Sequence, residues 1–327
     1  MQTIYVSEIS YNKAKATFEK VAAETGYTFE PVNEEEAHLA QAIKENDIKA
    51  FIADIYPYTN ELYSAIPAGG VIARYGVGHD SVDKEKASAQ GIHVANTPGV
   101  LDNAVAEHAC WMIGGISRHL HTAHPSTVSG EWAPKGGVEL RGRKVAILGF
   151  GRIGQNLCQK LSLGFGMHVT GVDIVDESVF ADQKSEIGYA EYTTDRNAAI
   201  ADADYVVLLM AVVPQTKHIA NAEFFKQMKS SGVLVNSARG ALVKENDLFD
   251  ALQSGEIAGA ALDVFEVEPY APQDAAKDLR TLDNILVTPH VGSNTVESNA
   301  AMAATAAKNV ITILEQGPDA CANIVNR

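Results

Sequence analysis

A glycine-rich turn in the middle of the chain constrains the fold more than any other feature of the sequence. Lys144–Leu148 is a short apolar run of the kind that forms a buried strand, and the segment Gly149–Gly154 (GFGRIG) follows it at once. A helix-period stretch comes next, so the glycines stand between a strand and a helix. In that place Gly149 permits a tight turn, Gly151 leaves the backbone open to a ligand, and Gly154 lets helix and strand pack closely. The arrangement predicts a βαβ unit that holds a diphosphate at the helix N-terminus.

An acidic residue lies at the matching point of the next strand. His168–Val172 leads directly into Asp173, 19 residues beyond Gly154. A carboxylate there accepts hydrogen bonds from the ribose hydroxyls of NAD and repels the 2′-phosphate of NADP. The following residues, Ile174 and Val175, offer no cation for that phosphate. The sequence therefore predicts a site for NAD.

Short apolar runs alternate with amphipathic stretches along most of the 327 residues. This rhythm is typical of βα units around parallel sheets, and the length suits two domains. We therefore predict an α/β fold with two doubly wound parallel sheets. The predicted strands are Thr3–Ser7, Thr28–Pro31, Ala50–Asp54, Val71–Tyr75, His93–Asn96, Lys144–Leu148, His168–Val172, Tyr205–Leu209, Val233–Val235, Gly259–Leu262 and Ile285–Thr288. The predicted helices include Asn12–Thr25, Asn33–Glu45, Asp102–Leu120 and Thr295–Glu315.

The predicted helix Asp102–Leu120 is apolar over much of its circumference. Such a helix is either a buried connection or a subunit interface, because its apolar surface needs a cover. Composition alone leaves both interpretations open.

Charge and cysteine content narrow the class of protein. A formal net charge of −15 argues against non-specific binding to nucleic acid. No apolar run approaches the roughly 20 residues that span a bilayer, and no basic segment precedes an apolar one at the N-terminus. Cys110, Cys158 and Cys321 form no pair or CxxC motif, which favours a reducing compartment. We expect a cytoplasmic protein that does not bind membranes.

Three polar segments follow predicted strands, at the sheet edge where open α/β sheets bind ligands. They are Val235–Gly240, Leu262–Pro269 and Val287–Ser293. Moving a hydride onto the carbonyl carbon of a 2-oxo acid requires a proton donor for the oxygen, and histidine suits that role near neutral pH. A carboxylate beside a histidine orients it and raises its pKa, and an arginine grips the substrate carboxylate. Arg239, Glu268 and His290 fill these three roles.

With these motifs in place, the chain resembles the D-isomer-specific 2-hydroxyacid dehydrogenases over essentially its whole length. The segments Arg74–Asp83, Gly91–Pro98 and Ala104–His108 extend the resemblance into the N-terminal half. The resemblance implies that Arg239 binds and orients the substrate, that His290 is the acid/base and that Glu268 is its partner. Glu268 is preferred to Glu266 because the family's glutamate directly precedes a proline, here Pro269. The sequence spacing between Glu268 and His290 resembles the corresponding spacing in phosphoglycerate dehydrogenases and glyoxylate/hydroxypyruvate reductases.

The family also implies a domain plan and a set of contacts. An NAD-binding Rossmann domain, residues 101–290, would be inserted into a flavodoxin-like substrate domain, residues 1–100 and 291–327, and two copies would form a homodimer through the NAD domain. The implied cofactor-binding residues are Gly149, Gly151, Arg152, Ile153, Gly154, Asp173, Ser237, Ala238, Arg239, Asp263, His290, Gly292 and Ser293. The implied substrate-binding residues are Arg74, Tyr75, Gly76, Val77, Arg239 and His290, with backbone N–H groups around Gly76 and Val77 on the substrate carboxylate.

One segment departs from the family pattern. Leu209–Ala211 stands where many members have His-x-Pro, and Val213 replaces a common threonine, which leaves the contacts of that loop open.

The leading hypothesis is an NAD-dependent oxidoreductase that acts at carbon 2 of a small D-2-hydroxy acid or its 2-oxo acid. Hydroxypyruvate, glyoxylate and 3-phosphoglycerate-like acids all remain candidate substrates, because the role of Arg74 has two interpretations. Arg74 either binds a phosphate or a second carboxylate of the substrate, or it is an ion-paired surface residue. The alternatives are an oxidoreductase for another small anion and a non-catalytic NAD sensor that binds partner proteins. We expect no metal site, because the helical spacing of His119 and His121 turns them to different sides. Trp132 is either a packing aromatic or a contact to a partner subunit.

Overall fold

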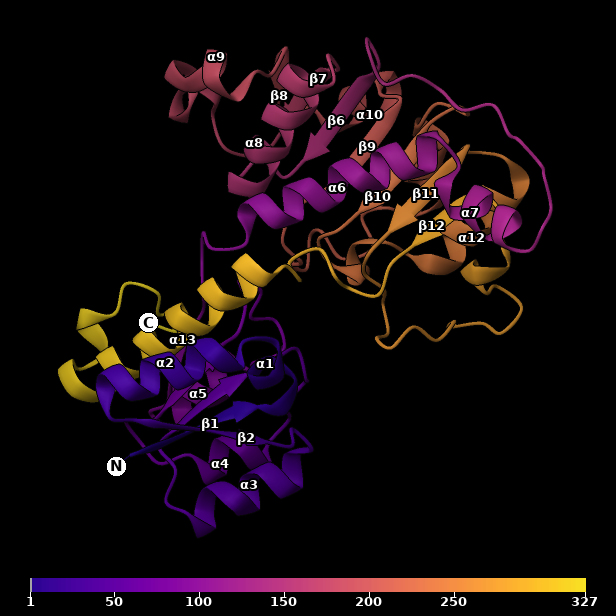
Figure 1. Cartoon of the computed structure of the whole chain (residues 1–327). Coiled ribbons are helices and arrows are strands. Elements are labelled where there is room, and N and C mark those ends of the chain that lie inside the picture. The colour runs from indigo at the N-terminus through magenta and orange to yellow at the C-terminus, as the bar shows by residue number, and fades with distance from the viewer. Residues whose placement is uncertain (1) are drawn as a thin grey trace. The chain divides into compact units, whose positions relative to one another are not determined.

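The chain divides into two compact units in the computed structural model, which describes residues 2–327. Unit 1 joins Met1–Leu101 to Asn294–Arg327, and unit 2 is the continuous segment Asp102–Ser293. The chain thus leaves unit 1, builds unit 2 and returns (Figure 1).

Unit 1 is built on a five-stranded parallel sheet with the order β2-β1-β3-β4-β5. This is the strand order of flavodoxin-like folds. The long helix α13, near the C-terminus, belongs to unit 1 and packs on α2 and β4. The strands are β1 (Thr3–Ser7), β2 (Thr28–Val32), β3 (Ala50–Ala53), β4 (Val71–Arg74) and β5 (His93–Ala95). The helices are α1 (Glu8–Lys13), α2 (Lys15–Thr25), α3 (Glu36–Glu45), α4 (Glu61–Ala65), α5 (Lys84–Ala89) and α13 (Val296–Gln316).

Unit 2 is built on a seven-stranded parallel sheet with the order β12-β11-β10-β9-β6-β7-β8. The order reverses between β6 and β9, which is the switch point where doubly wound sheets bind ligands. The strands are β6 (Lys144–Leu148), β7 (His168–Val172), β8 (Glu191–Thr193), β9 (Tyr205–Leu208), β10 (Val233–Asn236), β11 (Gly259–Leu262) and β12 (Ile285–Val287). The helices are α6 (Asp102–Ser117), α7 (Leu120–Val128), α8 (Arg152–Gln159), α9 (Lys184–Ile187), α10 (Arg196–Asp202), α11 (Ala222–Gln227) and α12 (Glu245–Ser254).

Both faces of the unit 2 sheet are buried. Side chains of α10, α11 and α12 pack on one face, and those of α6 and α8 pack on the other. All four residues of β9 and of β11 are buried, as expected for parallel strands covered on both sides. The predicted fold class, α/β with two doubly wound parallel sheets, is confirmed.

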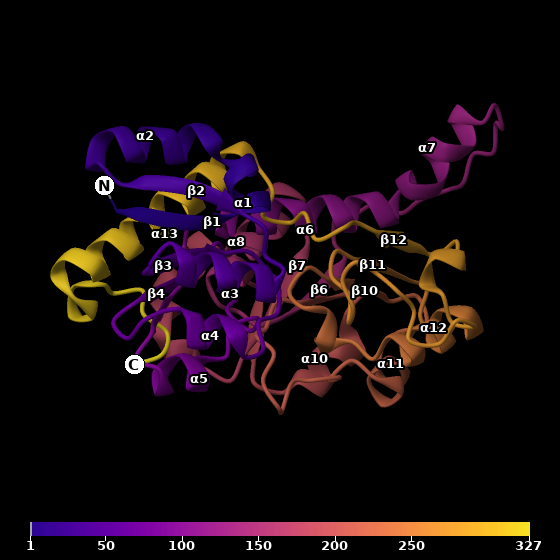
Figure 2. The same ribbon diagram turned by 90° about the horizontal axis from the view of Figure 1, so that it is seen from below.

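The structure corrects the predicted helix Asp102–Leu120. Helix α6 ends at Ser117, and a separate helix, α7, begins at Leu120. Between them His119 has a left-handed backbone with φ of 51°, which a right-handed helix cannot contain. Helix α7 has no buried residue and stands out from the rest of unit 2 (Figure 2).

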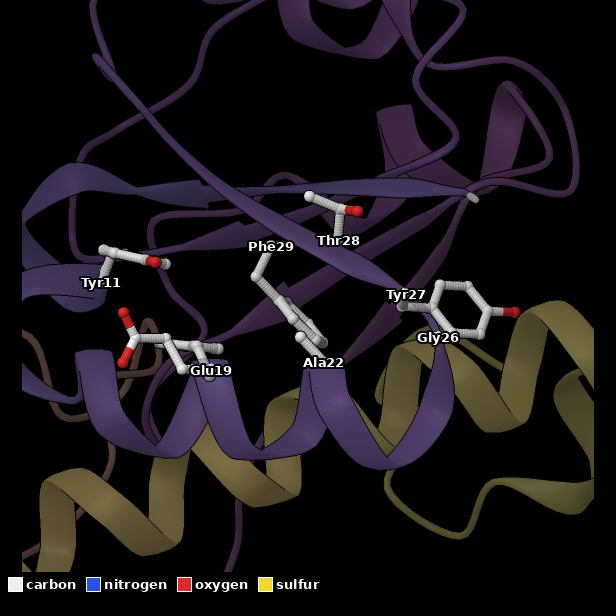
Figure 3. A pocket seen from close by; sticks show the side chains of 8 residues that line it. Tyr11, Glu19, Ala22, Gly26, Tyr27, Thr28 and Phe29 are labelled. Atoms are coloured by element: carbon white, nitrogen blue, oxygen red, sulfur yellow. The ribbon is translucent and has the colours of Figure 1, made fainter.

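Among residues 2–327, no helix is long and apolar enough to cross a membrane. Within the same residues, no group of three or more His, Cys, Asp or Glu side chains is arranged to hold a metal ion. A cavity of about 250 Å³ lies between α2 and β2 in unit 1, with Phe18, Tyr27 and Phe29 among its lining residues (Figure 3). It contains none of the predicted site residues and is lined mostly by apolar and aromatic groups, so we place no chemistry there.

Candidate active site

The glycine turn between β6 and α8 has the geometry that its sequence predicts. Gly149 has a φ of +98°, and a Cβ there would lie 2.6 Å from the backbone of Leu209 and Met210. A Cβ on Gly154 would lie 2.4 Å from the carbonyl oxygen of Gly149, so helix and strand meet closely. A Cβ on Gly151, in contrast, would meet no atom of residues 2–327 within 4 Å. Packing thus explains two of the glycines, and the third leaves an open approach to the start of α8, as a bound diphosphate requires.

Asp173 lies against this turn. One of its carboxylate oxygens accepts a hydrogen bond from the Phe150 N–H at 2.7 Å, and the other accepts one from the Ile174 N–H at 2.7 Å. The two bonds fix the carboxylate at the carboxyl end of β7, beside the strand that leads into the turn. This is the position from which an acidic side chain contacts a ribose.

Arg152 and Ile153 are the first residues of α8 after Gly151. The Arg152 Nε donates to Asp102 at 2.8 Å, although its side chain is 74% exposed. The N-terminus of α8 has no side-chain cap, so its first N–H groups remain for a ligand.

His290 and Glu268 form a direct pair. The His290 Nδ1 lies 2.6 Å from the Glu268 Oε2, and both side chains are about a quarter exposed. The other oxygen of Glu268 accepts a hydrogen bond from the Phe265 N–H at 2.9 Å, which fixes the carboxylate on its own loop. With Nδ1 held in this way, the imidazole presents Nε2 as the nitrogen for a substrate.

The backbone around His290 is held by the buried Asp263. His290 has a left-handed φ of 53°, and its N–H donates to the Asp263 carbonyl at 2.7 Å. The Asp263 carboxylate, only 1% exposed, accepts from the N–H groups of Val291 and Gly292 at 2.9 and 2.8 Å. Asp263 therefore holds the backbone at His290 and at the two residues that follow it.

Two further side chains complete this support. The Thr288 hydroxyl donates to Asp263 at 2.6 Å, and the His108 Nε2 lies 3.3 Å from the same oxygen. Burial raises the pKa of Asp263, but the hydrogen bonds from His108, Thr288 and Val291 outweigh it and hold the pKa below its ordinary value. Asp263 is thus a charged acceptor at neutral pH.

Arg239 stands on the turn after β10. The Asn236 side chain accepts from the Ala238 N–H at 3.1 Å and donates to the Arg239 carbonyl at 2.8 Å, so it shapes the turn. The Arg239 Nη1 donates to the Ala238 carbonyl at 2.7 Å. Ser237, in the same turn, is 8% exposed, and its hydroxyl has no hydrogen-bond partner in the described part of the chain. An orphaned hydroxyl at this edge fits a site that a polar cofactor completes.

The three catalytic candidates are brought to one edge of one sheet. Arg239, Glu268 and His290 follow β10, β11 and β12, which are neighbours in the order β12-β11-β10. The glycine turn and Asp173 follow β6 and β7 at the same edge. Gly292 and Ser293 close the segment at the boundary of unit 2.

The comparisons with known proteins decide the family. Residues 110–292 match the model of the D-isomer specific 2-hydroxyacid dehydrogenase, NAD binding domain. The chain belongs to this family. A glyoxylate reductase of Pyrococcus furiosus is 39% identical over 260 residues, which cover 77% of this chain and 74% of that protein. A hydroxypyruvate reductase of Thermotoga maritima is 36% identical over 230 residues, which cover 70% of this chain and 72% of that protein.

A solved structure agrees. The NADPH-dependent glyoxylate/hydroxypyruvate reductase of Sinorhizobium meliloti, in complex with NADP and malonate, superposes with a TM-score of 0.82 at 27% identity. The match covers 99% of this chain and 96% of that one. The chain is thus an NAD(P)-dependent 2-hydroxyacid oxidoreductase with an NAD-binding domain, which confirms the leading hypothesis on reaction class.

The predicted substrate residues of this dehydrogenase lie at the end of β4 in unit 1. Arg74 is 4% exposed and donates from Nη1 to the carbonyls of Ala53 and Tyr75, so it is not the ion-paired surface residue of one of the two interpretations left open. Tyr75 is also buried, and its hydroxyl donates to the Asn299 carbonyl at 2.8 Å.

The turn after Tyr75 is anchored from β5. The Thr97 N–H donates to the Gly76 carbonyl at 3.0 Å, and the Asn96 side chain donates to the Val77 carbonyl at 2.7 Å. The Gly76 N–H donates a hydrogen bond to the Arg74 carbonyl at 3.0 Å. The turn is therefore rigidly placed in unit 1.

Sequence reasoning missed His108, Glu245 and the pair His218–Glu266. His108 stands in a matched segment, but nothing in the sequence indicates that it reaches Asp263. Glu245 is the first residue of α12, a position where the sequence predicts a solvent-exposed acidic side chain. In the structure it is only 4% exposed. The His218 Nε2 lies 2.9 Å from the Glu266 Oε2, across 48 residues of sequence, so no local spacing reveals it.

Proposed function

We propose that the chain reduces small, unphosphorylated 2-oxo acids, with glyoxylate and hydroxypyruvate as the substrates to test first, and uses NADH. The observation that carries the proposal is the 2.6 Å contact of His290 with Glu268, on the loops beside Arg239 and in the same sheet as the glycine turn. The names of the relatives, glyoxylate reductase and hydroxypyruvate reductase, support this substrate class.

The roles of the side chains follow from their surroundings. When bound, the cofactor's nicotinamide supplies the hydride that reaches carbon 2 of the 2-oxo acid. His290 gives the proton from Nε2 to the carbonyl oxygen, while Glu268 on Nδ1 keeps the ring oriented and stabilises its charge. Arg239 binds the substrate carboxylate and polarises the carbonyl. The product is the 2-hydroxy acid, and His290 recovers its proton from solvent.

Residues for the cofactor are proposed on the same grounds. Gly149, Gly151, Arg152, Ile153 and Gly154 would take the diphosphate at the start of α8. Ser237, Ala238 and Asp263, with Gly292 and Ser293, would border the nicotinamide. Asp173 would accept from the ribose, and its carboxylate favours NADH over NADPH by repelling a 2′-phosphate.

Unit 1 is the proposed substrate domain and unit 2 the proposed NAD domain. We propose that Val77 presents a backbone N–H to the substrate carboxylate. Arg74 and Tyr75 form hydrogen bonds within unit 1 and would support the Gly76–Val77 turn.

The test is a substrate panel in the reductive direction. NADH oxidation is followed by absorbance with glyoxylate, hydroxypyruvate, pyruvate and 3-phosphohydroxypyruvate. We expect turnover with glyoxylate and hydroxypyruvate and little with the phosphorylated acid. Turnover restricted to the phosphorylated acid would overturn the substrate assignment, and no oxidation with any 2-oxo acid would indicate an NAD-binding protein without this activity.

We also propose that two copies form a homodimer through α6, α7 and the segment that follows them. Four large apolar side chains of this region are exposed: Trp111 by 72%, Leu120 by 59%, Val128 by 73% and Trp132 by 87%. Leu120 and Val128 lie on α7, which has no buried residue, and Trp111 lies on α6. Exposed apolar surface of this kind needs a cover, and a second copy offers the same surface. Trp111→Glu with Trp132→Glu should convert a dimer to a monomer in sedimentation equilibrium. A native protein that sediments as a monomer would refute the dimer.

The three cysteines are free and buried. Free thiols suit a reducing compartment, and we propose the cytoplasm on this ground. Cell fractionation with an antibody to the chain tests it, and recovery outside the cytoplasm would contradict it.

A further inference from the structure

The loop that carries Glu268 is held by a second glutamate that touches none of the reacting atoms. Glu245, the first residue of α12, is 4% exposed. Its Oε1 accepts a hydrogen bond from the Glu266 N–H at 2.6 Å, and the Glu245 N–H donates to the Glu266 Oε1 at 2.9 Å. The two residues therefore hold each other through a reciprocal pair of bonds between loop and helix.

The same peptide group is confined from the side of Arg239. A Cβ on Gly240 would lie 1.8 Å from the carbonyl carbon of Phe265 and 2.5 Å from the nitrogen of Glu266. Only a glycine fits against this peptide, because the opposing atoms are backbone and cannot rotate away. The turn of Arg239 and the loop of Glu268 are thus in direct backbone contact, and Glu245 fixes that loop at the same peptide.

The charges around Glu245 are mostly negative. Burial raises the pKa of the Glu245 carboxyl to about 7, the hydrogen bond from Glu266 opposes this, and the carboxylates of Glu266 and Glu268 add to the increase. Its Oε2 is buried without a hydrogen-bond partner in the described part of the chain. Tyr270 also faces this carboxyl, with Asp278 and Arg280 beside the tyrosine ring, and His218 pairs with Glu266.

We propose that Glu245 is a positioning residue of the reaction: it fixes the Phe265–Glu266 peptide and thereby holds Glu268 against His290. The chain of contacts is short and complete. Glu245 binds the Glu266 N–H, the neighbouring Phe265 N–H binds Glu268, and Glu268 binds His290 at 2.6 Å. The proposal rests on the proposed function, because it assigns a role within the same dyad.

Three variants test it. Glu245→Ala removes the acceptor, and Glu245→Gln keeps a carbonyl for the Glu266 N–H but cannot ionise. Glu256→Gln is the matched control, because Glu256 is an exposed glutamate just beyond the end of α12. Each protein is assayed for NADH affinity by fluorescence, for kcat and KM with the best 2-oxo acid of the panel, and for the His290 side-chain signals in ¹⁵N-resolved NMR without substrate.

We expect Glu245→Ala to bind NADH like the native protein but to lose about 100-fold in kcat, the size of effect that a misplacement of about 1 Å produces. The His290 Nδ1 proton signal should shift or broaden in the same variant, and Glu256→Gln should change nothing. Native kcat and an unmoved His290 signal in a folded Glu245→Ala protein would overturn the proposal.

Glu245→Gln keeps the proposal testable if the alanine variant does not fold. Above about pH 7 the native Glu245 gains a charge beside Glu266 and Glu268, whereas glutamine stays neutral. We expect the ratio of the variant kcat to the native kcat to rise with pH through this range. A Glu245→Gln protein whose Glu266 N–H signal moves while kcat and the His290 signal stay native at every pH would overturn the proposal. The NMR readout needs no turnover, so a failure of the proposed substrate class is distinguishable from a failure of the role of Glu245.

Discussion

Replacing Glu245 with glutamine should change how the stability of the protein depends on pH. The carboxyl has an ordinary pKa of 4.5, and in the folded chain burial raises its pKa to about 7. The folded state therefore binds this proton more tightly than the unfolded state does. The contribution of Glu245 to stability is fully present below about pH 4.5 and is lost as pH rises through 7.

The size of the loss follows from the two pKa values. A tenfold change in proton affinity is about 1.4 kcal/mol, so Glu245 alone lowers the free energy of unfolding by about 2.5 kcal/mol between pH 5 and pH 8. Glutamine has no proton to lose and removes this slope. The difference in stability between Glu245→Gln and the native protein should shift in favour of the variant by the same amount across this range.

The assay is urea unfolding followed by circular dichroism at several pH values. With a slope of about 3 kcal/mol per molar urea, the midpoint of the variant should move by about 0.8 M relative to that of the native protein. The exposed Glu256→Gln should run parallel to the native protein. Parallel midpoints for Glu245→Gln and the native protein at all pH values would refute the reasoning, since they would mean that Glu245 is ionised in the folded chain at low pH.

Three further predictions concern single contacts. Gly240→Ala should lower the free energy of unfolding by about 1–3 kcal/mol or more and reduce kcat, because the new Cβ would lie 1.8 Å from the Phe265 carbonyl carbon. Gly164→Ala is the control, because a Cβ there meets no described atom within 4 Å. Equal urea midpoints and equal kcat for the two variants would contradict this prediction. Asp173→Asn should raise the ratio of kcat/KM with NADPH to that with NADH by about fivefold or more, because two charges 4 Å apart repel by ~1–4 kcal/mol. An unchanged ratio counts against the ribose contact. Asp263→Asn should both slow turnover and lower the unfolding temperature, because an amide cannot accept the hydrogen bonds from Thr288, Val291 and Gly292 at once. Native turnover and a native unfolding temperature would show that the carboxylate does not hold the His290 loop.

The sequence was most informative where local chemistry and periodicity agree. The strands β1, β6, β7 and β11 have their predicted bounds, because each is an apolar run between turn residues. The sequence placed the catalytic candidates Arg239, Glu268 and His290 at one edge because each closely follows such a strand, and parallel strands bring their carboxyl ends to one edge. The glycine turn was found because its spacing has a steric reason.

The features that were missed depend on distant contacts or on a single backbone angle. Strand β8 has only three residues, and none of them is fully buried, so it has no hydrophobic signal. The break between α6 and α7 depends on the left-handed backbone of His119, in an otherwise helical composition. Glu245 is separated by 21 residues from the loop that it holds, and its burial is a property of the packed unit.

The most direct test of the proposed reaction compares His290→Gln with the native protein in two assays. NADH binding is measured by fluorescence, and NADH oxidation is measured with glyoxylate and hydroxypyruvate. We expect native NADH affinity and a loss of about 100- to 10,000-fold in kcat, because the proton donor is removed and the fold of unit 2 is kept. Undiminished turnover in His290→Gln would show that the His290–Glu268 pair does not transfer the proton.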